Sequence, residues 1–204
     1  GGRPLVYLDN AQSVAPGFRP PNAFRPLAQV AGLNENYARE LLELHSLGVD
    51  AGYTQRDVRE TARCLTGWTV NQSWRRGRFE FDATQHDFGE KTVLGKVIQA
   101  NGGETDGEQV FEAIRAHPAT PRFIARKLVR RFVADEPPLI LVEKTARAFA
   151  ASNGDIKTTL RVILFSDELQ KPDAAMPKYK RPLHVVAGAL RQLLGKAAAL
   201  DAGF

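Results

Sequence analysis

The chain has 204 residues, of which 43% are hydrophobic, so it can bury a sizeable core in one domain. Its single cysteine excludes an intramolecular disulfide, and no apolar run approaches the roughly 20 residues that a membrane-spanning helix needs. The formal net charge is +5, but five of the 28 basic residues lie in residues 122–131, and the other 23 balance the 23 acids. A generally basic surface for nucleic acid is therefore not indicated.

The first 32 residues are expected to form a loop-rich lead-in rather than a helix. Five prolines interrupt them, and each proline disfavours helical backbone at the residue before it. These prolines stand at positions 4, 16, 20, 21 and 26. From residue 33 to residue 204 the pattern predicts a single helical domain.

The first helix is predicted over residues 34–47, where apolar side chains recur at helical spacing. A second is predicted over residues 55–66, because Thr54 with Asp57 three residues later resembles a capping box. Helical periodicity returns after residue 103. The later helices are predicted over residues 106–116, 120–134, 139–152, 155–167 and 182–194.

The segment from about residue 70 to residue 103 has a different period. Residues 78–82 alternate between polar and aromatic side chains, and residues 91–98 are rich in β-branched side chains. The two runs predict one β-hairpin over about residues 78–98, with residues 83–90 as its loop. The expected fold class is therefore mainly α, a multi-helix globular domain with one inserted hairpin.

Two residues of the first helix are candidates for a functional site. On a helical wheel, Tyr37, Leu41 and Leu44 form the expected apolar side, and Glu40 and His45 lie at its opposite borders. Five residues apart on a straight helix, they cannot bind one ion as the ligand pair of a zinc-binding helix does. His45 is either a core-edge histidine bonded to a neighbour, or a ligand or general base completed by a second segment. Glu40 needs a partner, most simply an arginine, because burying an unpaired acid is costly.

The predicted hairpin loop carries a second pair of candidates, His86 and Asp87. On a loop that contains glycine, they could supply a general base with its orienting acid, or metal ligands completed by Glu40 or His45. The alternative is an Asp-Phe-Gly turn in which Asp87 hydrogen-bonds the local backbone. Neither interpretation identifies a particular metal or cofactor.

Arg122, Arg126 and Arg130 form a row of candidates for anion binding, because they recur every four residues on one predicted helix. Such a row could contact phosphate groups or an acidic partner, or it could be solvated or paired within the protein. Exposed aromatic side chains for base stacking are not interleaved with these arginines, so the pattern does not favour nucleic acid.

Several separate motifs occur in the order found in one bacterial family. They are RELLELHSLG at 39–48, FEFDATQHDFGE at 79–90, RFIARKLVRRFVAD at 122–135 and RPLHVV at 181–186. With them, the chain resembles over nearly its whole length the family catalogued as domain of unknown function eighteen hundred (DUF1800). The activity of that family is uncharacterised.

The resemblance has three implications. Full members are larger and carry a preceding helical region with a WHNHF-type stretch, so the chain is expected to be a C-terminal fragment. Many members are exported, which implies a periplasmic or secreted location. Their genes often stand beside those of a second uncharacterised family, similar to phosphatases or sulfatases, which implies a protein partner.

The leading hypothesis is an α-helical domain of an exported bacterial protein that acts by contacts with a protein or an envelope polymer and is not independently catalytic. The competing hypothesis is a hydrolase-like enzyme, with a metal as one variant, that uses His86 and Asp87 together with His45 and Glu40. The third is binding of anions or nucleic acid through the basic side of residues 122–131.

Overall fold

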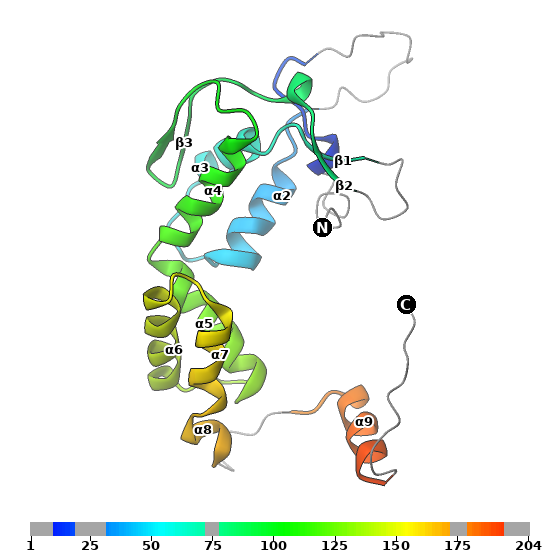
Figure 1. Cartoon of the computed structure of the whole chain (residues 1–204), viewed down its shortest axis with the longest axis vertical. Coiled ribbons are helices and arrows are strands. Elements are labelled where there is room, and N and C mark those ends of the chain that lie inside the picture. The colour runs from blue at the N-terminus through cyan, green and yellow to red at the C-terminus, as the bar shows by residue number, and fades with distance from the viewer. Residues whose placement is uncertain (1–9, 19–31, 72–77, 172–178, 194–204) are drawn as a thin grey trace. The chain divides into compact units, whose positions relative to one another are not determined.

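The computed structural model describes residues 10–18, 32–71, 78–171 and 179–193 (Figure 1). Within them, helices predominate and two small antiparallel strand pairs are present, so the predicted fold class is confirmed. The chain divides into two compact units, residues 1–124 and residues 125–204. Whether the segment from residue 33 onward folds as one domain stays a prediction. Among the described helices, none has both the length and the apolar character needed to cross a bilayer.

The first helix begins as the α-helix α2 (Glu35–Glu40) and continues as a π-helical turn, Leu41–Ser46. The Asn34 side chain caps it by accepting a hydrogen bond from the backbone of Asn36 at 2.8 Å. The π-helical turn forms the end of this helix, with Leu47 as its C-cap.

The predicted apolar side of this helix is wrong by one position. The fully buried residues are Ala38 and Leu42, whereas Leu44 is 47% exposed. Tyr37 and Leu41 are only half-buried. The reason is that small Ala38 occupies the buried side, and a wheel that weighs only large apolar residues overlooks it.

The second helix, α3 (Gln55–Cys64), begins as predicted with a capping box. The Asp57 backbone N–H donates to Thr54 Oγ1 at 3.2 Å, and the Thr54 backbone N–H donates to Asp57 Oδ2 at 2.8 Å. The other oxygen of the same carboxylate, Oδ1, accepts from the backbone of Leu94 at 2.8 Å. The Asp57 carboxylate therefore caps the start of α3 and also bonds the turn at Leu94 to this helix.

The strands form two hairpins, and the predicted pairing of residues 78–82 with residues 91–98 is wrong. Strand β1 (Trp68–Asn71) pairs with β2 (Arg78–Phe81), while β3 (Lys91–Val93) pairs with β4 (Lys96–Ile98). The turn between β3 and β4 is Leu94-Gly95, and both residues have positive φ, as a type I′ hairpin turn requires. Because leucine rarely adopts a positive φ, the sequence Leu-Gly does not predict this turn.

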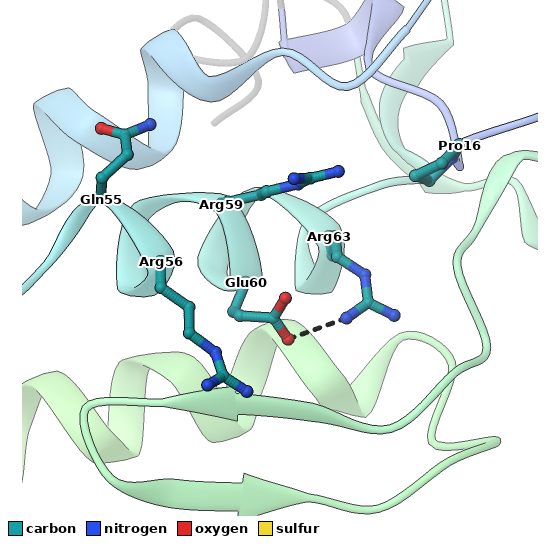
Figure 2. Close-up of a pocket in the computed structure, with 6 residues that line it drawn as sticks. All are labelled: Pro16, Gln55, Arg56, Arg59, Glu60 and Arg63. Carbon is teal, nitrogen blue, oxygen red and sulfur yellow. Dashed lines mark hydrogen bonds and ion pairs between the residues drawn. The ribbon is translucent and has the colours of Figure 1, made fainter.

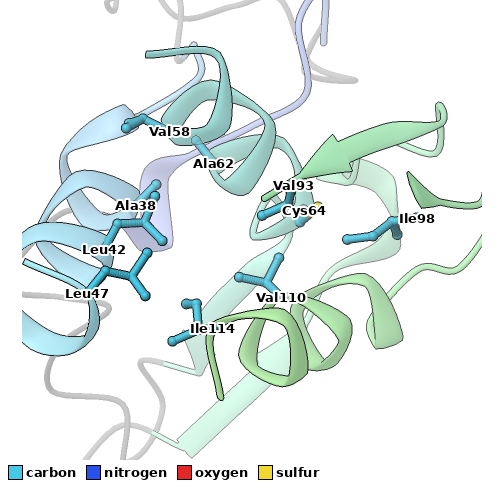
Figure 3. Close-up of a cluster of buried hydrophobic side chains, with 10 residues drawn as sticks. All are labelled: Ala38, Leu42, Leu47, Val58, Ala62, Cys64, Val93, Ile98, Val110 and Ile114. Carbon is cyan, nitrogen blue, oxygen red and sulfur yellow. The ribbon is translucent and has the colours of Figure 1, made fainter. Parts of the chain in front are cut away.

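The core of residues 1–124 is a cluster of fully or nearly fully buried side chains (Figure 3). It lies between α2, α3, the β3–β4 hairpin and α4 (Thr105–Ala116). Burying each of its larger aliphatic side chains contributes on the order of 1.5–3 kcal/mol. Its members are Ala38, Leu42, Leu47, Val58, Ala62, Cys64, Val93, Ile98, Val110 and Ile114.

The second unit is built on a helical hairpin of α6 (Leu139–Ala151) and α7 (Ile156–Leu164). The turn between them contains Asn153 and Gly154, both at positive φ, and the Asp155 side chain caps α7 by accepting from Thr158 N at 2.6 Å. The remaining helices are α5 (Ala119–Phe132), which crosses the boundary between the units, α8 (Asp167–Gln170) and α9 (Pro182–Leu193). The buried cluster of this unit is Ala125, Val129, Leu141, Val142, Ala146 and Ile163.

Candidate functional site

A fully buried ion pair joins the first residue of β3 to the first turn of α4. Lys91 Nζ donates to Asp106 Oδ2 at 2.7 Å, and both side chains have no exposed surface. The same ammonium donates to the backbone carbonyl of Gly89 at 2.9 Å and to that of Asp87. All three of its N–H donors are therefore used, which is the condition under which a buried lysine is tolerated.

His86 lies against the same carboxylate. Its Nδ1 is 2.8 Å from the backbone carbonyl of Thr66, which can only accept, so Nδ1 carries a hydrogen. Its Nε2 is 3.2 Å from Asp106 Oδ2. Phe81 and Phe88 place ring edges against the imidazole, with centroids 5.3 and 4.9 Å away. The imidazole is fully enclosed, and a substrate could reach it only if these neighbours moved.

Asp87, the sequence neighbour of His86, is turned to a different partner. Its carboxylate accepts from Arg63 Nε at 2.7 Å and Nη2 at 3.2 Å, and from the Gly89 backbone N–H at 2.9 Å. Burial alone would raise the pKa of the Asp87 carboxyl, but the hydrogen bonds from Arg63 and Gly89 outweigh it, so the pKa is lowered. The contact with Gly89 is the local turn foreseen as the alternative to a catalytic pair.

The acid in contact with His86 is therefore Asp106, and not the neighbouring Asp87; neither Asp106 nor Lys91 was among the predicted site residues. One signal for Lys91 was available, because residues two apart in a strand share a face and Val93 is buried on the same side. Asp106 offered none, because an acid in the first turn of a helix is normally explained by the helix dipole.

The structure does not bring Glu40 and His45 to His86 and Asp87. His86 contacts Thr66 and Asp106, and Asp87 contacts Arg63. His45 lies exposed on the π-helical turn. In the described ranges, Glu40 forms no ion pair with the predicted arginine. The described residues also contain no group of three His, Cys, Asp or Glu side chains placed to hold a metal ion. A catalytic role for these four residues stays a prediction.

Arg122, Arg126 and Arg130 are all exposed on α5, as the predicted anion-binding row requires. The buried residues of the same helix, Ala125 and Val129, belong to the cluster of the second unit. Anion binding by the row itself stays a prediction.

A separate cavity of about 490 Å³ lies on the outer side of α3 (Figure 2). We call it the arginine groove. In the figure, Glu60 lies between Arg56 and Arg63, while Arg59 extends along the helix toward Pro16. The lining residues are Pro16, Gln55, Arg56, Arg59, Glu60 and Arg63.

Comparison with known proteins places the sequence among relatives of unestablished activity. Residues 5–203 match the sequence model of a family described as a protein of unknown function (DUF1800). No curated protein and no solved structure matched the chain.

Proposed function

Because the chain belongs to the DUF1800 family, for which no activity is described, we propose from the surface of its second unit that it is a protein-interaction domain. The observation that carries the proposal is an exposed apolar surface on residues 125–204. The enclosed group of His86, Lys91 and Asp106 supports binding rather than catalysis, because all three N–H donors of Lys91 are already bonded within the protein.

The apolar surface lies at one end of the α6–α7 hairpin. Since a short turn joins the two helices, α6 begins at the same end at which α7 finishes. There Ile140 is 81% exposed, Phe165 76% and Leu139 68%. Phe132 at the end of α5 and Leu164 are also exposed. We call these five residues the apolar end; a group of large exposed apolar side chains of this kind typically marks an interaction site.

Helix α9 presents a second apolar side. Leu183, Val186 and Leu190 are spaced three and four residues apart and therefore share one side of the helix, and all three are exposed, Leu183 at 75%. An amphipathic helix normally covers such a side against another protein element. The second unit thus offers two surfaces of the kind that a protein partner covers.

The partner we propose is the product of the neighbouring gene, a protein similar to phosphatases or sulfatases, with both proteins located in the periplasm or outside the cell. The support for this choice is the resemblance to family members with that gene arrangement. An envelope polymer is a weaker candidate for the apolar end, because the large side chains there are hydrocarbon and offer few hydrogen bonds to a hydrated chain.

The test is binding of the purified neighbouring protein to the wild-type chain and to the double variant Ile140→Asp/Phe165→Asp. Losing two central apolar contacts should weaken binding about 700-fold, because interface hot spots contribute about 2 kcal/mol or more each and every 1.4 kcal/mol is tenfold. Ile156→Asp is the matched control, since Ile156 is also exposed but lies at the opposite end of α7. Equal effects of the two changes, or no binding by the wild-type chain, would refute the proposal.

A further inference from the structure

We propose that the arginine groove on α3 is a binding site for a phosphate monoester carried by a small polar molecule. It lies in residues 1–124 and is independent of the apolar end, so either proposal can fail without the other. Some of the charged side chains in the groove are paired with one another, and others have no ion-pair partner in the described ranges.

Arg63 is fixed in place by two carboxylates, those of Glu60 and Asp87. Arg63 Nη1 donates to Glu60 Oε2 at 2.8 Å, and Asp87 holds the rest of the guanidinium. Glu60 Oε2 also accepts from the backbone of Thr92 at 3.2 Å. These bonds raise the pKa of Arg63 even though burial opposes them, so its charge is permanent. Among the described residues, Glu60 therefore forms its ion pair with Arg63 and none with Arg56 or Arg59.

Gln55 forms a fixed polar wall of the groove. Its side-chain amide donates to Glu35 and accepts from Arg39 Nη2 at 2.9 Å. Because both the donor and the acceptor of its amide are hydrogen-bonded, the Gln55 side chain is held in one rotamer. The neighbouring arginine side chains are the ones that can change rotamer to meet a ligand.

Arg56 and Arg59 carry the uncompensated charge. Both are exposed, and neither forms a hydrogen bond or an ion pair with another residue in the described ranges. They stand three apart on α3, which places them on neighbouring positions of the helix surface. The groove therefore presents to solvent two guanidinium groups, each a planar set of N–H donors, that have no ion-pair partner in the described ranges.

The ligand class follows from charge and shape. A phosphate monoester carries about two negative charges at neutral pH and three acceptor oxygens, which matches two guanidinium groups. A phosphodiester or a carboxylate has about one charge and two free acceptor oxygens, so it would bond two guanidinium groups more weakly. Among the described lining residues there is no aromatic ring for a nucleobase, and Pro16 is the one apolar side chain, so a sugar or polyol body fits better. The volume of about 490 Å³ suits a molecule of that size.

The test is calorimetric titration of the whole chain with glucose 6-phosphate at low ionic strength, with glucose and dimethyl phosphate as comparison ligands. We expect binding of glucose 6-phosphate, no binding of glucose, and weaker binding of the diester. Arg56→Ala and Arg59→Ala should each lower the affinity about tenfold, because a hydrogen bond to a charged group contributes on that order. The double variant should abolish binding.

Arg161→Ala provides the matched control, since Arg161 is an exposed arginine on α7, outside the groove. Circular dichroism of each variant shows whether the fold is retained, which is expected because Arg56 and Arg59 have no described partner. The proposal is overturned if glucose 6-phosphate does not bind, if the diester binds equally well, or if Arg161→Ala weakens binding as much as Arg59→Ala. Tighter binding of a phosphodiester polymer than of the monoester would likewise overturn the charge match.

Discussion

Replacing Lys91 by methionine tests whether the buried ion pair holds the first unit together. The change keeps the length of the side chain but removes Nζ, the donor of the 2.7 Å bond to Asp106 and of the bonds to the carbonyls of Gly89 and Asp87. The Asp106 carboxylate would then be buried without its cation, in a cluster where its other oxygen already has no hydrogen-bond partner. Breaking a buried ion pair in this way typically costs about 3–5 kcal/mol, so we expect a loss of that size in the free energy of unfolding.

The assay is urea unfolding at pH 7, followed by circular dichroism and tryptophan fluorescence, with Lys96→Met as the matched control. Lys96 lies in the same hairpin and is exposed, so its replacement should change stability by no more than about 0.5 kcal/mol. A loss below about 1 kcal/mol for Lys91→Met would refute the reasoning, because it would show that Asp106 is not left as a buried, uncompensated charge. The double change Lys91→Met/Asp106→Leu should recover part of the loss, since replacing both partners removes the unpaired carboxylate.

Two further predictions concern titratable groups in the same unit. The folded-state pKa of Asp87 is lowered from 3.8, so the unfolded chain binds more protons and stability falls as the pH drops through and below about 4. Asp87→Asn should reduce this loss of stability, measured by urea unfolding at pH 3 and pH 6. An unchanged difference between the two pH values would contradict the prediction. Burial raises the pKa of the Cys64 thiol to about 12, so a thiol reagent at pH 8 should react with Cys64 only after denaturation, and rapid labelling of the folded chain would contradict this.

Hydrogen bonds to Thr66 and Arg63 hold the segment between β2 and β3, which includes the short 3-10 turn Ala83–Gln85. Thr66 Oγ1 accepts from the Asp87 backbone at 2.9 Å and donates to the carbonyl of Arg63 at 2.6 Å. Arg63 in turn donates to the carbonyl of Glu90 at 3.2 Å. The segment is therefore bonded at Asp87 to Thr66, just after α3, and at Glu90 to Arg63 of α3 itself. A network with its donors and acceptors satisfied in this way stabilises one conformation of the loop.

The sequence by itself determined the features that depend on neighbours within a few residues. The capping box of Thr54 and Asp57 spans three residues, and the Asn153-Gly154 turn ends α6 through its own backbone preference. Helical periodicity placed most helices correctly, because it reports burial along one segment. Exposure of Arg122, Arg126 and Arg130 followed from the same pattern.

Only the tertiary structure decided which segments meet and which charges are paired. Asp106 is 20 residues from His86 and 15 from Lys91, so no local pattern links the three. The partner of β2 and the burial of Ala38 likewise depend on what packs against them. The physical reason is that capping and turns are satisfied by nearby backbone, whereas the pairing of a buried charge depends on whichever distant group the fold brings within hydrogen-bond distance.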